Sequence, residues 1–172
     1  MAGGGTVRAI RDRIRAVENT AKVTRAMELV AASKMRRAQE RALAARPYAE
    51  RMRAVLAHLS GAAGSLDEDQ LPPLLREREV VHFAFLHITA DRGLAGGLNA
   101  NMNRAGAALA LERQPQVERV SVLPVGRKGR DFFRRAGFPL LAEFDDIGDF
   151  PDMSQILPIA RVIINDYTAG EI

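Results

Sequence analysis

The sequence contains no cysteine and no tryptophan, and only 5% of its 172 residues are aromatic. The lack of cysteine excludes disulfides, thiolate nucleophiles and Cys-based metal sites. No apolar run approaches the ~20 residues that a membrane-spanning helix needs, and the first residues, MAGGGTVRAIRDR, lack the apolar centre of a signal peptide. These absences predict a soluble, cytoplasmic protein. The few aromatic residues and many alanines favour close helix–helix contacts over a bulky core.

Positive charge is concentrated in the first third of the chain. Residues Thr6 to His58 hold 13 Lys and Arg against 5 Asp and Glu, a net charge of +8, whereas all other residues hold 12 against 16, a net charge of −4. This asymmetry predicts two parts with different surroundings. The basic part is expected to meet nucleic acid, an anionic membrane or an acidic protein surface.

The basic part is predicted to be one long helix. No glycine lies between Thr6 and Leu59, and Thr6 is the expected N-cap after three glycines. Gly61 and Gly64 are expected to close the far end, and Pro47 is expected to kink or divide the helix. At 1.5 Å per residue the helix would be ~80 Å long, far longer than a small domain.

Apolar residues follow this helix at alternating steps of three and four, with one slip near Met27. This spacing is typical of a coiled-coil seam, and its many alanines would let a partner helix approach closely. No later segment has comparable length, so the partner is expected from another chain or from a continuation of this one. Thr24 is the only polar member of the seam, which comprises Ile10, Ile14, Val17, Ala21, Thr24, Met27, Ala31, Met35, Ala38, Ala42, Ala45, Ala49, Met52, Leu56 and Leu59.

The rest of the chain is predicted to be a linker and an α/β domain. Residues 1–60 form the helix, residues 61–79 are rich in Gly, Pro and polar residues and indicate a linker, and residues 80–172 alternate strands with helices, which favours a parallel sheet. This domain is interpreted as C-terminally incomplete, since no closing strand follows its last helix. The expected elements are a buried strand over 80–89, a helix over 98–113, a strand over 119–125, a helix over 126–138, a strand over 140–144 and a helix over 153–168.

No pattern in the domain predicts catalysis, a cofactor or a metal. The glycines of the loop from Asp91 to Gly97 match neither phosphate-binding motif, so a structural turn packed against the long helix is favoured over nucleotide binding. His82 and His87 are five residues apart on one strand and would face opposite sides, too far apart to share a metal.

Two further clusters left alternatives open. The acidic segment 145–152, DDIGDFPD, does not fit a calcium loop and is interpreted as solvated. The cations of residues 126–130, GRKGR, are expected to form salt bridges to a neighbouring subunit rather than an anion site.

Three segments in the same order resemble one known family. Residues 19–39, NTAKVTRAMELVAASKMRRAQ, closely resemble the N-terminal helix of the gamma subunit of F-type ATP synthases. Residues 89–101, TADRGLAGGLNAN, resemble that family's domain loop, and residues 125–133, VGRKGRDFF, also agree. The resemblance covers nearly the whole chain.

The resemblance implies a non-catalytic rotor subunit, the central stalk. Its N-terminal helix would pair with a long C-terminal helix as an antiparallel coiled coil. This shaft would turn inside the ring of alpha and beta subunits, which hold the nucleotide sites, while its foot rests on the c-ring beside the epsilon subunit. Ion flow across the membrane would thereby drive ATP synthesis. The complex would lie at the cytoplasmic face of the bacterial plasma membrane, with this subunit peripheral.

The resemblance also implies which residues contact partners. Met27 is similar to the family's shaft residue facing the beta subunit, and a basic face of Arg25, Lys34, Arg36 and Arg37 could pass acidic residues of the ring. Ala95 stands where many members have cysteine, and the chain stops before the family's next strand and C-terminal helix. The implied shaft contacts are Lys22, Thr24, Arg25, Met27, Val30, Ala31, Lys34, Met35, Arg36 and Arg37, and the domain loop matches at Asp91, Arg92, Gly93, Gly96, Gly97 and Asn99.

Two rival functions are weaker on the residues themselves. A nucleic-acid-binding arm would be basic without a continuous apolar seam. A nucleotide-binding enzyme would carry a phosphate-binding lysine or a ribose-binding acid, and neither is visible. No nucleic acid is expected among the partners.

Overall fold

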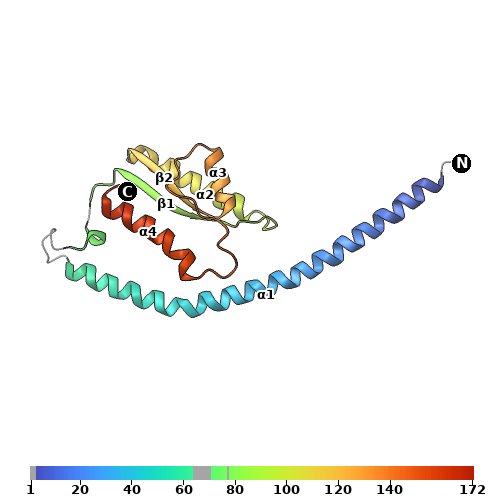
Figure 1. Ribbon diagram of the computed structural model, residues 1–172, viewed down its shortest axis with the longest axis horizontal. Helices are drawn as coiled ribbons and strands as arrows, with labels where there is room; N and C mark the ends of the chain where they lie inside the picture. Colours follow the sequence, from blue (N-terminus) through green and yellow to red (C-terminus); the bar gives the residue numbers. More distant parts are fainter. Residues whose placement is uncertain (1–2, 64–70, 77) are drawn as a thin grey trace. The chain divides into compact units, whose positions relative to one another are not determined.

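The computed structural model describes residues 3–63, 71–76 and 78–172, and the chain divides into two compact units, Met1–Ser65 and Leu66–Ile172. The expected linker over 61–79 lies partly outside the described residues. Each unit has its own architecture, a single helix in the first and an α/β arrangement in the second (Figure 1).

The first unit is the helix α1, Gly3–Ala63, which is 61 residues long. The helix begins before Thr6, so the prediction of Thr6 as N-cap is wrong. Gly61 lies inside the helix, and Gly64 is outside the described residues. Pro47 also lies inside the helix and does not divide it; α1 is drawn as one continuous, gently curved ribbon (Figure 1). Because proline lacks an N–H, the carbonyl four residues earlier, that of Leu43, loses its helical donor.

The described residues of the second unit form two parallel strands and three α-helices. His82 lies opposite Arg119 and Ile88 opposite Val125 in the strand register. Two elements, the helix over 98–113 and the strand over 119–125, have the bounds predicted from the sequence. The elements are η2 Pro73–Leu75, β1 His82–Ile88, α2 Leu98–Arg113, η3 Gln114–Gln116, β2 Arg119–Val125, α3 Arg127–Arg135 and α4 Met153–Ala169.

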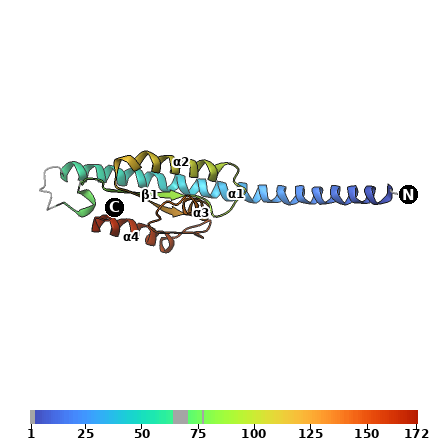
Figure 2. The same ribbon diagram turned by 90° about the horizontal axis from the view of Figure 1, so that it is seen from above.

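Helices lie on both faces of the sheet. Figure 2 shows α2 and α4 on opposite sides of β1, and Figure 1 shows α3 beside α2, away from α4. On the α4 side, Ile159 packs with Leu123 and Val125 of β2. On the other side, Phe133 of α3 is fully buried, and its ring lies 5.9 Å from that of Phe85 in β1. Burying an aromatic ring of this size contributes roughly 2–3 kcal/mol, so this side chain helps to hold α3 on the sheet.

The imidazole of His87 occupies space that two glycines leave open. It is buried, and its centroid lies 4.9 Å from the Phe133 ring. A Cβ on Gly106 of α2 would lie 2.8 Å from His87 Nδ1, and one on Gly129 of α3 would lie 2.7 Å from its Cδ2. His87 Nε2 is 3.0 Å from Asn103 Oδ1, and Asn103 Nδ2 donates to the carbonyl of Lys128 at 3.3 Å. One side chain thus links β1, α2 and α3.

The strand predicted over 140–144 is absent as a regular element. Only two isolated parallel bridges form, Val122 with Leu140 and Val125 with Phe144. In a parallel ladder the N–H and C=O of one residue face the same neighbour. The carbonyl of Pro124 accepts from Phe144 N at 3.1 Å, but its nitrogen has no hydrogen to donate. The missing donor in β2 interrupts the ladder and explains why the prediction is wrong.

The prediction that the first strand is buried is also wrong for β1. Residues 120–125 of β2 are buried, because β2 lies between β1 and the bridged segment. In β1 only His87 is buried, while Leu86 and Ile88 are exposed. Among the described residues, β1 pairs on one side only and is therefore an edge strand.

Candidate partner-binding surfaces

The apolar seam of α1 is exposed along its length. Every side chain from residue 6 to residue 59 is exposed, and Ile14, Met27 and Met35 retain 52%, 52% and 60% of their accessible surface. Isolated exposed apolar residues are common, but a contiguous row marks an interaction surface. A shallow groove beside part of this row is lined by Val17, Thr20, Ala21, Thr24, Arg25 and Glu28. Among the described residues of this unit, no other segment covers the seam.

Thr24, the only polar residue in the seam, has its hydroxyl hydrogen-bonded within the helix. The Thr24 hydroxyl donates to the carbonyl of Thr20 at 2.9 Å, and the Thr20 hydroxyl donates to that of Ala16 at 2.8 Å. Both hydroxyls therefore already donate within the helix, so burial against a partner helix would leave neither donor unpaired.

The cations assigned to one basic face do not share a face. At ~100° per residue, Arg25 and Arg36 lie on the side of the helix opposite to Met27, whereas Lys34 lies beside Met27 within the apolar row. Arg25 pairs with Glu28 at 2.9 Å and Arg36 with Glu40 at 3.0 Å. These exposed pairs contribute little to stability. The spacing of these residues in the sequence is enough to show that Arg25 and Arg36 lie on a different side of the helix from Lys34.

The remaining shaft residues extend the row around Met27. Val30 and Ala31 flank Met27 on the same side of the helix, and Met35 lies one step further round. All of the shaft residues predicted from the sequence lie in α1, and all are exposed: Lys22, Thr24, Arg25, Met27, Val30, Ala31, Lys34, Met35, Arg36 and Arg37.

The domain loop is joined to the start of α3 at its base. Asp91 Oδ1 accepts from the backbone N–H of Arg127 at 2.8 Å, the first turn of α3. Thr89 Oγ1 accepts from Gly129 N at 2.8 Å, and the Ala90 carbonyl accepts from Lys128 N at 3.1 Å. A helix N-terminus attracts anions, but here Asp91 already occupies it. This contact favours a structural turn over a phosphate site.

Other loop residues hold the turn into α2. Asn99 Oδ1 accepts from Ala90 N at 3.2 Å, and Gly97 is the N-cap of α2. Gly96 has a φ of 54°, which glycine adopts freely. Arg92 and Gly93 are exposed at the turn. The structure therefore brings Asp91 and Asn99 together at the base, while Arg92 and Gly93 lie outward.

Leu94 was missed by the sequence reasoning. It is 94% exposed and has a φ of 62°, which side-chain-bearing residues rarely adopt. An apolar side chain held outward in a costly backbone conformation is a feature of contact loops. The sequence did offer one indication: Leu94 is a large apolar residue between Gly93 and Ala95, in a loop that otherwise contains four glycines or alanines.

Two of the three cations at residues 126–130, Arg127 and Arg130, pair within the chain. Arg127 donates to both carboxylate oxygens of Asp146, at 2.8 and 2.9 Å, and Arg130 pairs with Asp145. The hydrogen bond to Asp131 raises the pKa of the Arg130 guanidinium and lowers that of the Asp131 carboxyl. Arg127 and Arg130 thus have partners among this chain's own carboxylates.

The acidic segment is therefore not merely solvated. Asp145 and Asp146 pair with α3, and Arg134 pairs with Glu143 beside them. Asp152 caps α4 by accepting from Ser154 N at 2.9 Å. The Ser154 hydroxyl, followed by the Gln155 backbone, lowers the pKa of Asp152. No group of three or more His, Asp or Glu suited to a metal occurs among the described residues.

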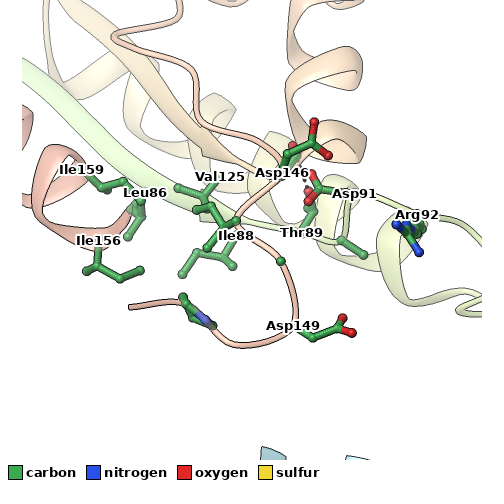
Figure 3. Close-up of a pocket in the computed structure, with 15 residues that line it drawn as sticks. Leu86, Ile88, Thr89, Asp91, Arg92, Val125, Asp146, Asp149, Ile156 and Ile159 are labelled. Carbon is green, nitrogen blue, oxygen red and sulfur yellow. Dashed lines mark hydrogen bonds between the residues drawn. The ribbon is translucent and has the colours of Figure 1, made fainter. Parts of the chain in front are cut away.

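A pocket of about 720 Å³ opens on the α4 side of the sheet (Figure 3). Its floor is apolar, with Leu86, Ile88 and Val125 from the strands and Ile156 and Ile159 from α4. Its rim carries the charged side chains of Asp91, Arg92, Asp146 and Asp149. The rim lacks a paired acid and base that could move a proton between substrate atoms, and Asp146 is already bound to Arg127.

The two strand histidines lie apart, as predicted. His82 Nε2 is 2.8 Å from Ser121 Oγ, and His82 Nδ1 is 2.5 Å from the carbonyl of Glu171. This position is on the α4 side of the sheet, whereas His87 is on the α2 side. Ser121 is completely buried, so the Ser–His contact has no access for a substrate and is structural.

The sequence is similar to known proteins over nearly its whole length. Residues 6–172 match a family model described as ATP synthase. The chain is 50% identical over 166 residues to an ATP synthase gamma chain from Dehalococcoides mccartyi, 46% identical over 166 residues to one from Roseiflexus castenholzii, and 45% identical over 163 residues to one from Acidithiobacillus ferrooxidans. These alignments cover 95–96% of this chain but 55–56% of the relatives. Within the described ranges, no helix combines the length and apolarity needed to cross a bilayer.

Proposed function

We propose a function on the premise that this chain belongs to the ATP synthase family, which the match over residues 6–172 establishes. The chain spans about half the length of the curated gamma chains it matches. We infer that it supplies the long helix and the α/β foot of a central-stalk rotor subunit. In this role it performs no catalysis itself and serves as a mechanical part of a complex whose nucleotide sites lie on other subunits.

One observation carries this proposal: a 61-residue helix exposes an apolar seam that no described residue of its unit covers. A single helix bends easily, whereas two helices packed along a seam resist bending and twisting. Small residues at Ala38, Ala42 and Ala45 would let the second helix approach closely, giving a slender rod. The second helix would run antiparallel to α1 and come from the same subunit.

The partners of the shaft follow from this arrangement. Alpha and beta subunits would surround the part of α1 around Met27. Met27 and its neighbours would face a beta subunit. The foot would rest on a ring of c subunits beside epsilon, at the cytoplasmic face of the plasma membrane. Ion flow would turn the foot, and the rotating shaft would move the beta subunits through successive conformations that differ in nucleotide affinity.

The domain loop is proposed as a second contact surface. Arg92, Gly93 and Leu94 are exposed at its tip. At its base, Asp91 accepts a hydrogen bond from the start of α3, and Asn99 accepts one from Ala90 N, just after β1. A rigid base with an exposed apolar tip suits a contact that must be made repeatedly during rotation. The nucleotide-binding alternative is weaker, because Asp91 occupies the helix N-terminus that would hold a phosphate.

Coupled ATP synthesis by the full-length protein in its assembled complex tests the shaft. Met27→Asp places a charge on the seam side and is expected to lower ion-driven ATP synthesis at least about tenfold, since an unpaired buried charge is strongly unfavourable. Leu29→Asp is the matched control: it lies two residues away, is 65% exposed, and faces the opposite side. Unchanged synthesis in the Met27 variant would contradict the proposed role of this face.

A further inference from the structure

The pocket on the α4 side of the sheet is not part of the proposed shaft. Its aliphatic floor leaves much apolar surface uncovered, since Ile88 is 59% exposed, Leu86 43% and Ile156 39%. Val125 and Ile159, from the same lining, are buried. Isolated exposed apolar residues are common, whereas several around one hollow mark a binding site. The volume of about 720 Å³ is in the range that holds a small organic molecule.

The position of the pocket in the fold also favours ligand binding. Ile88 is the last residue of β1, Val125 is the last residue of β2, and both line the pocket. The pocket therefore lies at the carboxyl ends of two parallel strands. Its other walls come from the N-terminal half of α4 and from the turn over residues 146–149. Open α/β sheets hold their ligands at this end of the strands.

Apolar and charged side chains lie at different ends of the pocket. Figure 3 shows Leu86, Ile156 and Ile159 gathered at one end and Asp91 and Asp146 towards the other. A purely apolar ligand would desolvate the carboxylates without replacing their hydrogen bonds to water. A purely polar ligand would leave the aliphatic floor in contact with water. A ligand that matches both ends has an apolar body and one polar head group.

The rim favours a positive head group. The described residues that line the pocket include three carboxylates but one guanidinium, that of Arg92. Asp146 is largely neutralised, because Arg127 donates to both of its oxygens. Asp91 accepts instead from the backbone N–H of Arg127, which carries no formal charge, so the charge of Asp91 remains. Since Asp91 is half-buried and Arg92 is exposed, solvent screens the carboxylate less than the guanidinium.

We propose that this pocket binds a small organic cation with an aliphatic body, a primary amine on an alkyl chain. The chain would lie on Leu86, Ile88 and Ile156, and the ammonium group would lie beside Asp91. An ammonium group has three donors, and one carboxylate oxygen of Asp91, Oδ2, is not used in the hydrogen bond to α3. The proposal is independent of the rotor function, because it requires only the foot.

Ligands that share one tail or one head group test the proposal. Octylammonium, octanoate and butylammonium are titrated into the full-length protein below their micelle-forming concentrations, and binding is followed by calorimetry. Octylammonium is expected to saturate a single site and to bind at least about tenfold more tightly than octanoate. Butylammonium keeps the head group but should bind at least about tenfold more weakly than octylammonium, since each buried methylene changes affinity about fourfold.

Three variants locate the site. Ile88→Lys places a long cationic side chain in the pocket and should abolish octylammonium binding. Val80→Lys makes the same change of charge and size at an exposed residue outside the pocket lining, and should bind octylammonium as the parent does. Asp91→Asn keeps an acceptor oxygen for α3 but removes the charge. It should bind octylammonium at least about fivefold more weakly and octanoate no more weakly than the parent.

Three results would overturn the proposal. Octylammonium binding that does not saturate would mean that another segment fills the pocket in the full-length protein. Octanoate binding as tight as that of octylammonium would mean that the rim does not select a cation. Unchanged octylammonium binding in Ile88→Lys, with a circular dichroism spectrum like that of the parent, would place the binding site elsewhere. None of these measurements involves alpha or beta subunits, so each leaves the proposed rotor function untouched.

Discussion

Asp91 and the backbone N–H of Arg127 are joined by a hydrogen bond of 2.8 Å. The carboxylate at the end of one strand thereby caps the helix that follows the next strand. This bond joins the domain loop to residues 125–133, two segments that are 36 residues apart in the sequence.

Replacing this carboxylate should loosen the start of α3. Asp91→Ala is expected to lower the free energy of unfolding by about 1 kcal/mol, as for the loss of a helix cap. Asp91→Asn keeps an acceptor oxygen and should lose less than half as much. Urea unfolding measures both, and hydrogen exchange at Lys128 and Gly129 should rise in the alanine variant. Equal stability of the alanine variant and the parent would show that the bond contributes nothing.

Gly126 should tolerate no side chain. Its φ is 106°, and a Cβ there would lie 2.1 Å from the Thr89 carbonyl oxygen. Gly126→Ala is expected to cost roughly 3 kcal/mol or more, through both backbone strain and this clash. Gly93→Ala is the control, because a Cβ there meets nothing within 4 Å, and it should change stability by less than about 0.5 kcal/mol. Similar denaturation midpoints for the two variants would contradict this reasoning.

The ion pair between Arg127 and Asp146 should contribute modestly. Its side chains are 44% and 72% exposed, so solvent screens the interaction. A double-mutant cycle with Arg127→Gln and Asp146→Asn is expected to give a coupling energy below about 1 kcal/mol. About 1 M NaCl should reduce the coupling further. A coupling of several kcal/mol that resists salt would mean that the pair is far less exposed in solution.

Stability should depend on pH through Asp152. Hydrogen bonds from the Ser154 hydroxyl and the Gln155 backbone lower its pKa below the ordinary value of 3.8. A lowered pKa in the folded state means that this carboxylate contributes stability above the unfolded pKa and loses it as pH falls through the folded one. The difference in melting temperature between the parent and Asp152→Asn should therefore favour the parent near pH 6 and shrink towards pH 3. A difference that is constant over this range would exclude ionisation as the cause.

Local patterns predicted the regular elements of the foot well. The bounds of α2 and β2 follow from apolar runs between turn residues, so neighbours in sequence suffice to define them. The third strand was mispredicted because the interruption arises from Pro124 in a different strand. The burial of β1 was mispredicted because an apolar run does not reveal whether its strand has neighbours on both sides.

For the surfaces, too, the sequence predicted features that depend on local spacing and missed those that depend on the folded chain. The seam was visible because its spacing is local, and the separation of Arg25 from Lys34 was also contained in their spacing. The pairing of Arg127 and Arg130 with carboxylates of their own chain depends on a turn that brings residues 15 to 19 positions away alongside α3. The outward position of Leu94 depends on a backbone conformation that its residue type does not favour.

The His87 imidazole, lying against Gly106 and Gly129, restricts how this foot can vary among related sequences. Each glycine leaves too little room for even one methyl group while the imidazole is present. A relative with alanine at either position is therefore expected to carry a smaller side chain at position 87, and one that keeps histidine should keep both glycines. The sizes of the side chains at positions 87, 106 and 129 are therefore expected to depend on one another, because one strand and two helices share the same space there.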